Sequence, residues 1–488
     1  MMTAPAATRT RPERRFWLVA LGLIAAIAAA TGLVILRGST VGLAVTTTPA
    51  SGATISGRTL IGLTFPTAME ADSVEAHLTL QPAVAGRWSW EENGSRSDRV
   101  AHFIPLQPLT PGVIYRATLA KGARATNGRT IRADTVWQFT IRPPTLLLLR
   151  AAPNGPPDVR NLWMANADGS GLRQITNERM GVLEYSASLD GARIAYTTPE
   201  TQRATALWAI NLDGTGRTRL SPVGDPSIYA TPAWSPAGDI ILYVLRGVVV
   251  TGNAPNASLI GGVNPSVTIG TSKLWGVAPD GRPLGRIYGR GDEVGFDPVW
   301  SPDGTRIGFR EQVNAQSEAA VVLSDLSPDP VKVPAGPGSR ITWSPDSGRA
   351  AYDEAVPDPT GAVSSRIIIV GADGTGARTF LGADARSEAA PAWSPDGNRL
   401  LFTRAGAGAG GAMTDLWVAN IDGSGRARLL GGDGLSTEEP AWSPDGGTAL
   451  ATRFNPTTGE DRAVWFVGAD GQSAHPIIPG GERVSWIP

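Results

Sequence analysis

A phrase of three residues, Trp-Ser-Pro, recurs along much of this 488-residue chain. Five complete copies begin at Trp234, Trp300, Trp343, Trp393 and Trp442, and a degenerate copy ends the sequence at 485–488. Most copies continue into an Asp-Gly pair and a short apolar run, as Asp303-Gly304 does before 307–309. Self-similarity at a fixed spacing indicates a repeat architecture, in which each unit buries its apolar face against the next.

A second phrase alternates with the first and consists of an apolar pair, often Leu-Trp, followed by Asn-x-Asp-Gly. Strong copies lie at 162–171, 207–216 and 416–425. Weaker copies contain Asp-Gly at 280–281, 373–374 and 470–471. Residues 321–325 occupy the remaining position of the series and have no Gly. The two series define seven units, most of them 43 to 50 residues apart. Four short strands per unit at such a period are typical of propeller blades. The chain is therefore predicted to be all-β, with a seven-bladed β-propeller over residues 144–488.

The two ends of the repeat series predict how the ring closes. The last unit ends with its innermost strand, 484–488, whereas the first unit begins at 146–150 with the equivalent of a second strand. We expect the C-terminal strand to complete the first sheet, because this pairing leaves neither strand with an open edge.

The N-terminal residues predict a membrane anchor. Residues 16–36 contain no charged side chain and are long enough to cross a hydrocarbon core about 30 Å thick as a helix. Four arginines between positions 9 and 15 place the tail 1–15 in the cytoplasm and the bulk of the chain outside, in the periplasm or at the cell surface. A cleaved signal peptide is the alternative. Residues 37–43 are then a linker.

Residues 44–142 show short alternating apolar runs separated by turn residues, a pattern that predicts a β-sandwich. Phe103-Ile104-Pro105, followed by 109–112 and Tyr115, resembles the bacterial Ig-like domain of the SbsA type. The resemblance implies a spacer or adhesive module. The isolated His77 and His102 in this region are more typical of a surface or core than of a metal site.

The two repeated phrases together resemble the TolB-like, WD-type propeller repeat, which also occurs in the propellers of prolyl-oligopeptidase relatives. The resemblance covers residues 144–488 and implies a fold. It implies no single activity, because one fold hosts many functions.

In a propeller with strands ordered from the channel outward, both kinds of Asp-Gly turn lie on one face. The longer connections lie on the opposite face, and the longest are 247–272, 353–365 and 405–413. Long irregular connections on a rigid scaffold are common binding elements, although they are also common as surface padding.

Charged residues recur three positions before the Trp position of the repeat, where the chain enters the innermost strand. They predict a channel rim of three acids and two arginines: Glu184, Asp297, Glu439, Arg340 and Arg483. The rim could bind a charged peptide or a cation, or its members could pair with one another. The Asn-x-Asp-Gly turns lack the further carboxylates that calcium needs, so no metal-binding residue is predicted.

Composition and motifs favour a protein that is not an enzyme. The chain has no Cys, no Gly-x-Ser-x-Gly motif and, within the predicted propeller, a single histidine, His475. We therefore predict no catalytic residue and no cofactor. With 43 basic and 44 acidic residues the net charge is −1, which does not indicate a nucleic-acid partner.

The sequence thus predicts a membrane-anchored, extracytoplasmic binding or scaffold protein whose propeller recruits a protein or peptide partner in the cell envelope. A carbohydrate- or metal-dependent propeller enzyme of the lyase or hydrolase type is the alternative. A sensor that passes occupancy of the propeller through the membrane helix is a third possibility.

Overall fold

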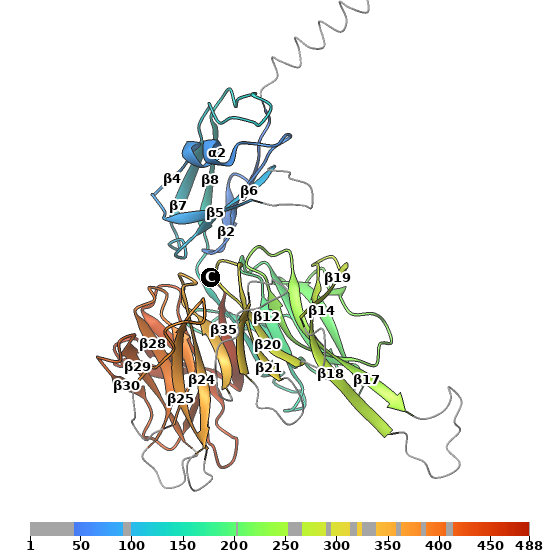
Figure 1. The fold of residues 1–488 in the computed structure, drawn as a ribbon. Coiled ribbons are helices and arrows are strands. Elements are labelled where there is room, and N and C mark those ends of the chain that lie inside the picture. The colour runs from blue at the N-terminus through green and yellow to red at the C-terminus, as the bar shows by residue number, and fades with distance from the viewer. Residues whose placement is uncertain are drawn as a thin grey trace, which may run out of the picture.

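The described part of the computed structural model contains nine β-sheets, two before residue 142 and seven after it (Figure 1). The structure describes residues 43–90, 99–201, 204–251, 266–288, 294–312, 320–324, 338–357, 363–381, 387–406 and 413–487. The predicted tail, membrane helix 16–36 and nearly all of the linker lie outside these residues. Within the described ranges, no helix has the length and apolar character needed to cross a bilayer.

The first two sheets face each other as a sandwich. One has the order β1 (Thr46–Thr48), β3 (Ile61–Thr64), β6 (Val100–Pro105), β5 (Gly86–Trp90), and the other β2 (Ala53–Ile55), β8 (Thr135–Ile141), β7 (Ile114–Leu119), β4 (Leu78–Gln81). Alternating side chains from both sheets, among them Leu63 and Phe139, form one buried core. A short helix, α2 (Ala71–His77), adds the buried Val74 to this core, and the sequence pattern does not predict it.

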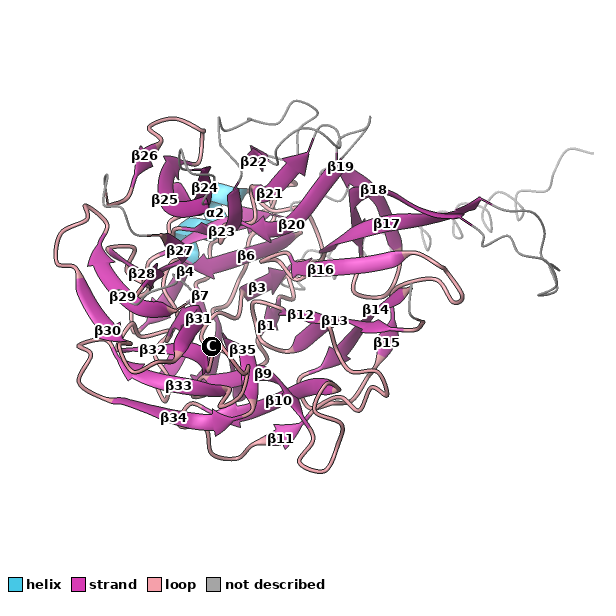
Figure 2. Ribbon diagram, turned by 90° about the horizontal axis from the view of Figure 1, so that it is seen from below, coloured by secondary structure: helices cyan, strands magenta, loops and turns pink. Residues whose placement is uncertain are grey.

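The other seven sheets follow one another around a common axis (Figure 2). The first three are β35 (Gly481–Ile487), β9 (Thr145–Ala151), β10 (Arg160–Asn166), β11 (Arg173–Gln174); β12 (Glu184–Ala187), β13 (Arg193–Pro199), β14 (Thr205–Asn211), β15 (Thr218–Arg219); and β16 (Ile228–Trp234), β17 (Ile241–Thr251), β18 (Ser266–Val277), β19 (Pro283–Tyr288). The fourth has three described strands, β20 (Val294–Trp300), β21 (Ile307–Gln312) and β22 (Ala320–Ser324). The prediction of a β-propeller is confirmed.

The last three sheets have four strands each. They are β23 (Gly338–Trp343), β24 (Arg349–Pro357), β25 (Val363–Gly371), β26 (Arg378–Thr379); β27 (Glu388–Trp393), β28 (Arg399–Ala405), β29 (Thr414–Asn420), β30 (Ala427–Leu430); and β31 (Ser436–Trp442), β32 (Thr448–Phe454), β33 (Ala463–Gly468), β34 (Ala474–Pro479). Each of the seven sheets thus contains one repeat unit of the sequence, and its innermost strand carries the Trp-Ser-Pro position.

The ring closes as the sequence predicts, because β35 pairs antiparallel with β9, with Ile487 opposite Thr145 and Gly481 opposite Arg150. The phenol oxygen of Tyr185, on the neighbouring sheet, lies 2.9 Å from the carbonyl oxygen of Leu147 and 3.2 Å from Ser485 Oγ. A Cβ atom at Gly191 would meet the Ile487 side chain at 2.2 Å, so a larger residue in this turn would force its neighbours to shift. The C-terminal strand is therefore held by its own sheet and by the next one.

Three tryptophans of the repeat join neighbouring sheets by hydrogen bonds. The indole N–H groups of Trp300, Trp343 and Trp442 donate to carbonyl oxygens in the innermost strand of the preceding sheet, at 3.2, 3.2 and 3.1 Å. The acceptor of Trp442 is Ala392, and the guanidinium of Arg399 lies 4.6 Å from the centre of the Trp442 ring. These tryptophans therefore act as wedges between adjacent blades.

The Trp-Ser-Pro-Asp-Gly turns are built by a serine and an aspartate. Ser443 Oγ donates to Asp445 Oδ1 at 2.5 Å and accepts the Thr448 N–H at 3.0 Å, while the Gly447 N–H donates to Asp445 Oδ1 at 2.9 Å. The Ser443 hydroxyl is the main cause that lowers the pKa of Asp445 below its usual value. The same serine–aspartate pair occurs in four other sheets, at Ser188, Ser301, Ser344 and Ser394.

Two of the predicted irregular connections are partly strand. β17 and β18 extend through 247–251 and 266–272, and β24 and β25 extend into 353–365. The cause is continued ladder pairing, with Thr251 opposite Ser266 and Pro357 opposite Val363. The prediction of long irregular segments is therefore wrong for these stretches, while 252–265, 358–362 and 407–412 lie outside the described residues.

Ser443→Ala is expected to lower the stability of the propeller by about 1 kcal/mol at pH 7, because it removes a buried hydroxyl with several hydrogen bonds. A depressed carboxyl pKa gives stability that is present above the unfolded value of 3.8 and is lost as the pH falls through the lower folded value. The difference in melting temperature from wild type should therefore shrink below about pH 4. Calorimetry from pH 7 to pH 2.5 measures it, with the exposed Thr457→Ala as control. A difference that does not change with pH would show that the Ser443 hydroxyl does not act through the Asp445 carboxylate.

Candidate functional site

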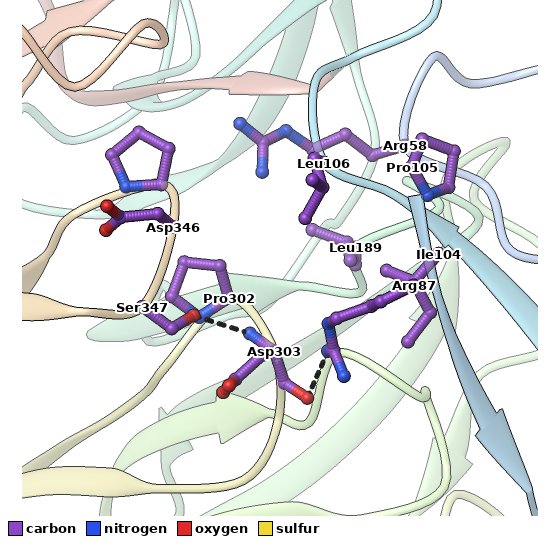
Figure 3. A pocket seen from close by; sticks show the side chains of 11 residues that line it. Arg58, Arg87, Ile104, Pro105, Leu106, Leu189, Pro302, Asp303, Asp346 and Ser347 are labelled. Atoms are coloured by element: carbon purple, nitrogen blue, oxygen red, sulfur yellow. Dashed lines mark hydrogen bonds between the residues drawn. The ribbon is translucent and has the colours of Figure 1, made fainter. Parts of the chain in front are cut away.

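The two faces of the propeller differ because the Ig-like domain sits on one of them (Figure 1). Arg87 on β5 reaches the turn between β20 and β21, where its guanidinium donates a hydrogen bond to the carbonyl oxygen of Asp303 (Figure 3). The Asp303 N–H in turn donates to Ser347 Oγ at 3.0 Å, in the corresponding turn of the next sheet. The domain thus contacts the face that carries the Trp-Ser-Pro-Asp-Gly turns.

The space left at this junction is small. One cavity of about 70 Å³ lies between Arg87, Leu106 and the turn at Ser347, and another of about 170 Å³ lies between His102 and Asp190. Burial lowers the pKa of Arg87, and the nearby Asp303 carboxylate opposes that shift. Because a guanidinium keeps its charge in proteins, the contact is a cation held against carbonyl and carboxylate oxygens.

The opposite mouth of the channel opens into a cavity of about 680 Å³. It is lined from the innermost strands β12, β16, β20, β31 and β35, and its wall includes Glu184, Thr231, Asp297, Glu439, Arg483 and Trp486. We call this the mouth cavity. Four of the five predicted rim residues therefore line one cavity. The fifth, Arg340, occupies the equivalent position in β23, and its side chain lies outside the described part of the structure.

A recurring β-bulge lies at Asp297, Glu439 and Arg483 and at the equivalent positions of two further innermost strands, but not at Glu184. The backbone φ angles of Thr231, Asp297, Ala390, Glu439 and Arg483 lie between +43° and +54°, in the left-handed region. At each of them the register of the innermost strand shifts against the second strand. An extra residue in a strand leaves the ladder and re-aims its side chain. In four of the five positions a proline follows the bulged residue directly, and this proline is the sequence signal for the bulge. Spacing from the Trp position locates these residues but does not predict that the strand is bulged there.

The left-handed backbone is costly for these residues. A non-glycine residue at positive φ loses about 1 kcal/mol relative to glycine, and a β-branched residue such as Thr231 is unusual there. None of the five is glycine, although glycine fills many other positive-φ positions of the chain. Strain of this kind is found where a side chain has a task, and it motivates a functional hypothesis for the mouth.

The charged groups of the mouth cavity have different partners. Asp297 Oδ2 pairs with Arg310, whose Nε lies 2.9 Å away, and Arg483 donates to the carbonyl oxygen of Leu183 at 2.9 Å. The Glu184 carboxylate accepts the backbone N–H of Thr231. None of these three contacts joins two residues of the predicted rim, so simple pairing within the rim does not describe them.

Tyr185 and Thr231 add polar groups to the wall of the cavity. Burial is the main cause that raises the pKa of the Tyr185 phenol, and the negative charge of Glu439 acts in the same direction. The Thr231 hydroxyl is buried and has no hydrogen-bond partner among the described residues. Within the same ranges, no three His, Asp or Glu side chains gather closely enough to hold a metal ion.

Comparison with known proteins identifies both parts of the fold. Residues 40–141 match the family model described as a bacterial Ig-like domain. No curated protein matches the chain. Similar solved structures include TolB from Acinetobacter baumannii, with 15% identity over 76% of this chain and 85% of that one and a TM-score of 0.40. Another is the Pyrococcus horikoshii acylaminoacyl peptidase, with 12% identity over 69% of this chain and 50% of that one and a TM-score of 0.46. A third is the Vibrio parahaemolyticus oligogalacturonate lyase, with 14% identity over 66% of this chain and 91% of that one and a TM-score of 0.47.

The family model confirms a bacterial Ig-like domain, and the propeller that follows it rests on the sheet topology. The narrower SbsA and WD types stay predictions. At such low identities the likeness concerns the fold alone.

The prediction that the chain is not an enzyme is wrong, because enzymes occur among the structures that resemble this fold. The structural neighbours include acylaminoacyl peptidase, a prolyl endopeptidase and an oligogalacturonate lyase, at 12–14% identity, as well as TolB. The lack of a Gly-x-Ser-x-Gly motif excludes one kind of active site and leaves others. Missing motifs therefore do not exclude enzymes as a class.

Arg87→Ala is expected to loosen the Ig-like domain on the propeller, because a charged hydrogen bond contributes about 1.5–3 kcal/mol. The chain has no Cys, so Lys121→Cys and Asp280→Cys provide two specific sites for spin labels, one on each domain. The interdomain distance distribution should be narrow in the labelled parent and broader with Arg87→Ala. The exposed Arg116→Ala serves as control. Equal widths for all three proteins would show that Arg87 does not hold the domains together.

Ala390→Gly tests the strain at the mouth without changing a charge. Since Ala390 has a φ of +54°, glycine should raise the free energy of unfolding by about 1 kcal/mol. The neighbouring Ala389→Gly, in ordinary strand backbone, should lower it by about 0.5–1 kcal/mol. Chemical denaturation of both variants measures the difference. A loss of stability in Ala390→Gly equal to that in Ala389→Gly would mean that the bulge is not strained.

Proposed function

We propose that this protein is an extracytoplasmic binding protein of the cell envelope, and that its propeller recruits a protein or peptide partner through the mouth cavity. The observation that carries the proposal is the contrast between the two faces. The Ig-like domain contacts one face, and the other face presents a cavity of about 680 Å³ lined by charged side chains, three of them on bulged strands. Ligand cavities commonly have volumes of about 300–1,000 Å³.

The geometry supports a ligand that enters along the channel axis. The lining residues come from five different sheets, so a group bound at the centre contacts strands that are far apart in the sequence. Rigid strands hold the binding side chains more firmly than loops do. In this proposal the propeller has seven blades and its fixed ring presents the rim residues Glu184, Asp297, Glu439 and Arg483 to the partner, with Arg340 contributing from the equivalent position of β23.

The location in the envelope follows from the first 43 residues in this proposal. The uncharged stretch 16–36 anchors the chain in the membrane, and the arginines before it hold the tail 1–15 in the cytoplasm. The Ig-like domain then lies between the membrane and the propeller. Because the domain contacts the face with the Trp-Ser-Pro-Asp-Gly turns, in this proposal the mouth cavity at the other ends of the innermost strands faces away from the domain and toward envelope components.

Site-specific cross-linking tests the proposal in cells. A photoreactive amino acid replaces Val299, which lines the mouth cavity, in the full-length chain. The matched control carries the same amino acid at Asp280, an exposed residue of a turn on the opposite face. We expect one defined envelope protein to cross-link at Val299 and not at Asp280, identified by mass spectrometry. The cross-link should weaken when the unlabelled partner is added as a competitor.

Two results would contradict the proposal. Identical cross-linked species at both positions would mean that the capture does not depend on the mouth cavity. Cross-links to a polysaccharide fragment or a small molecule that the purified chain then converts would favour the alternative, a propeller enzyme of the lyase or hydrolase type.

A further inference from the structure

A second cavity, of about 560 Å³, opens between the connection from β11 to β12 and the sheet that contains β13 and β14. We call it the lateral cavity, and its wall includes Glu178, Arg179, Met180, Glu200, Trp208 and Arg217. We infer that the lateral cavity binds the C-terminal residue of a polypeptide, whose carboxylate is held by Arg179 and Arg217 and whose apolar side chain covers Met180. This site is separate from the mouth cavity and does not rest on the proposed function.

The connection that forms one wall of the lateral cavity is held on both sides. The buried Asn161 side chain, on β10, accepts the Glu178 N–H at 2.7 Å and donates to the Glu178 carbonyl oxygen at 3.2 Å. Thr198 Oγ1, on β13, donates to the carbonyl oxygen of Gly181 at 2.8 Å. Gly181 has a φ of +76°, and a Cβ atom there would lie 2.7 Å from the carbonyl oxygen of Arg160. Two sheets thus fix this backbone, and a site built in advance loses little entropy on binding.

The carboxylates of the wall already have cationic partners. Glu178 Oε1 accepts from Arg217 Nη2 at 2.8 Å, from Arg217 Nε at 3.0 Å and from the Tyr196 hydroxyl at 2.7 Å. Burial and the hydrogen bond to Glu178 raise the pKa of Tyr196, so its proton stays on the phenol oxygen. Glu200 pairs through both of its oxygens with Arg219. A bound cation would therefore compete with an arginine for each carboxylate.

Three donors of the wall lack a partner among the described residues. They are the guanidinium of the exposed Arg179, Arg217 Nη1 and the buried indole N–H of Trp208. The described wall has two acids and two arginines and thus no net charge, so its free donors, and not a charge excess, determine what it binds. Arg179 follows Glu178 in the chain and Arg217 is bonded to Glu178, so one carboxylate can accept from both arginines. Such charge-assisted hydrogen bonds are stronger than neutral ones.

Apolar surface in the same wall favours a chain end over an inorganic anion. Met180, next to Arg179 in the chain, is 45% exposed although its side chain is large and apolar, and Pro199 belongs to the same wall. Methionine adapts to apolar groups of different shape. Arg217 is held in place by Trp208, because its Cζ lies 3.4 Å from the centre of the indole ring. An inorganic anion leaves Met180 in water, whereas an apolar C-terminal residue covers it and brings its carboxylate to the arginines.

The lateral cavity and the mouth cavity share one connection. Residues 178–180 line the lateral cavity and Glu184 lines the mouth cavity. Met180 and Glu184 are four residues apart, so their Cα atoms lie within about 14 Å of each other. Glu184 pairs with Thr197, and Thr198 lines the lateral cavity, so both cavities open at the same end of this sheet. A chain end bound in the lateral cavity therefore lies within a few residues' reach of the mouth cavity.

The test uses the purified full-length chain and three small probes. N-acetyl-leucine has a terminal carboxylate and an apolar side chain, and N-acetyl-leucinamide lacks the carboxylate. The α-amide of N-acetyl-glutamate carries its carboxylate on the side chain and has no terminal one. Saturation-transfer NMR measures dissociation constants into the millimolar range. We expect N-acetyl-leucine to bind about tenfold more tightly than either of the other probes.

Variants then assign the binding to the lateral cavity. Arg179→Gln should weaken N-acetyl-leucine about fivefold and leave N-acetyl-leucinamide unchanged, because it removes only a charge. Met180→Ser should weaken both leucine probes about threefold. The matched controls are Arg282→Gln, at an exposed arginine of the β18–β19 turn, and Val223→Ser, at a side chain that is 86% exposed. Arg179 and Met180 are exposed, so the fold should be retained, and circular dichroism checks this.

Three results would overturn the inference: equal affinity for N-acetyl-leucine and its amide, no measurable binding of N-acetyl-leucine, or an unchanged affinity in Arg179→Gln. Equal affinity for N-acetyl-leucine and the glutamate amide would also contradict it, because the cavity would then bind an acidic side chain and not a chain end. The cross-link at Val299 tests the mouth cavity separately, since neither Arg179 nor Met180 lines that cavity.

Discussion

The tryptophan wedge between neighbouring sheets is the contact on which the rest of the propeller depends. At Trp300, Trp343 and Trp442 the indole N–H is satisfied by a carbonyl oxygen of the preceding sheet. The serine and aspartate that follow Trp442 fix the turn to the second strand. In these three places the hydrogen bond positions a sheet against its predecessor, and the pairing of β35 with β9 closes the series.

A ring fixed in this way can tolerate strain at its inner edge. The bulges at Thr231, Asp297, Glu439 and Arg483 place non-glycine residues in left-handed backbone where regular strands would be more stable. Their common result is a set of side chains directed to one mouth of the channel, while Arg87 holds the Ig-like domain against the other face. Stability thus comes from the wedges and turns, and recognition comes from the bulged positions.

The sequence predicts the parts of this structure that repeat. Trp-Ser-Pro and Asp-Gly phrases predict the fold and the strand order, and the unequal ends of the series predict the ring closure, because these features depend on local patterns. The site is predicted less completely. Spacing from the Trp position identifies Glu184, Thr231, Asp297, Glu439 and Arg483, but not Tyr185 or Trp486, whose roles depend on which sheets meet at the axis. Contacts between domains, such as Arg87 with Asp303, leave no local pattern, and the extension of β17 and β18 depends on pairing beyond the repeat.

Recognition through the mouth cavity is best tested by a structure of the full-length chain bound to a partner isolated from its native envelope. We expect a segment of the partner to occupy the mouth cavity and to contact β12, β31 and β35, while the Ig-like domain keeps its place on the opposite face. A partner bound to the outer strands or to the Ig-like domain, with the mouth cavity left to solvent, would show that the bulged positions do not serve recognition.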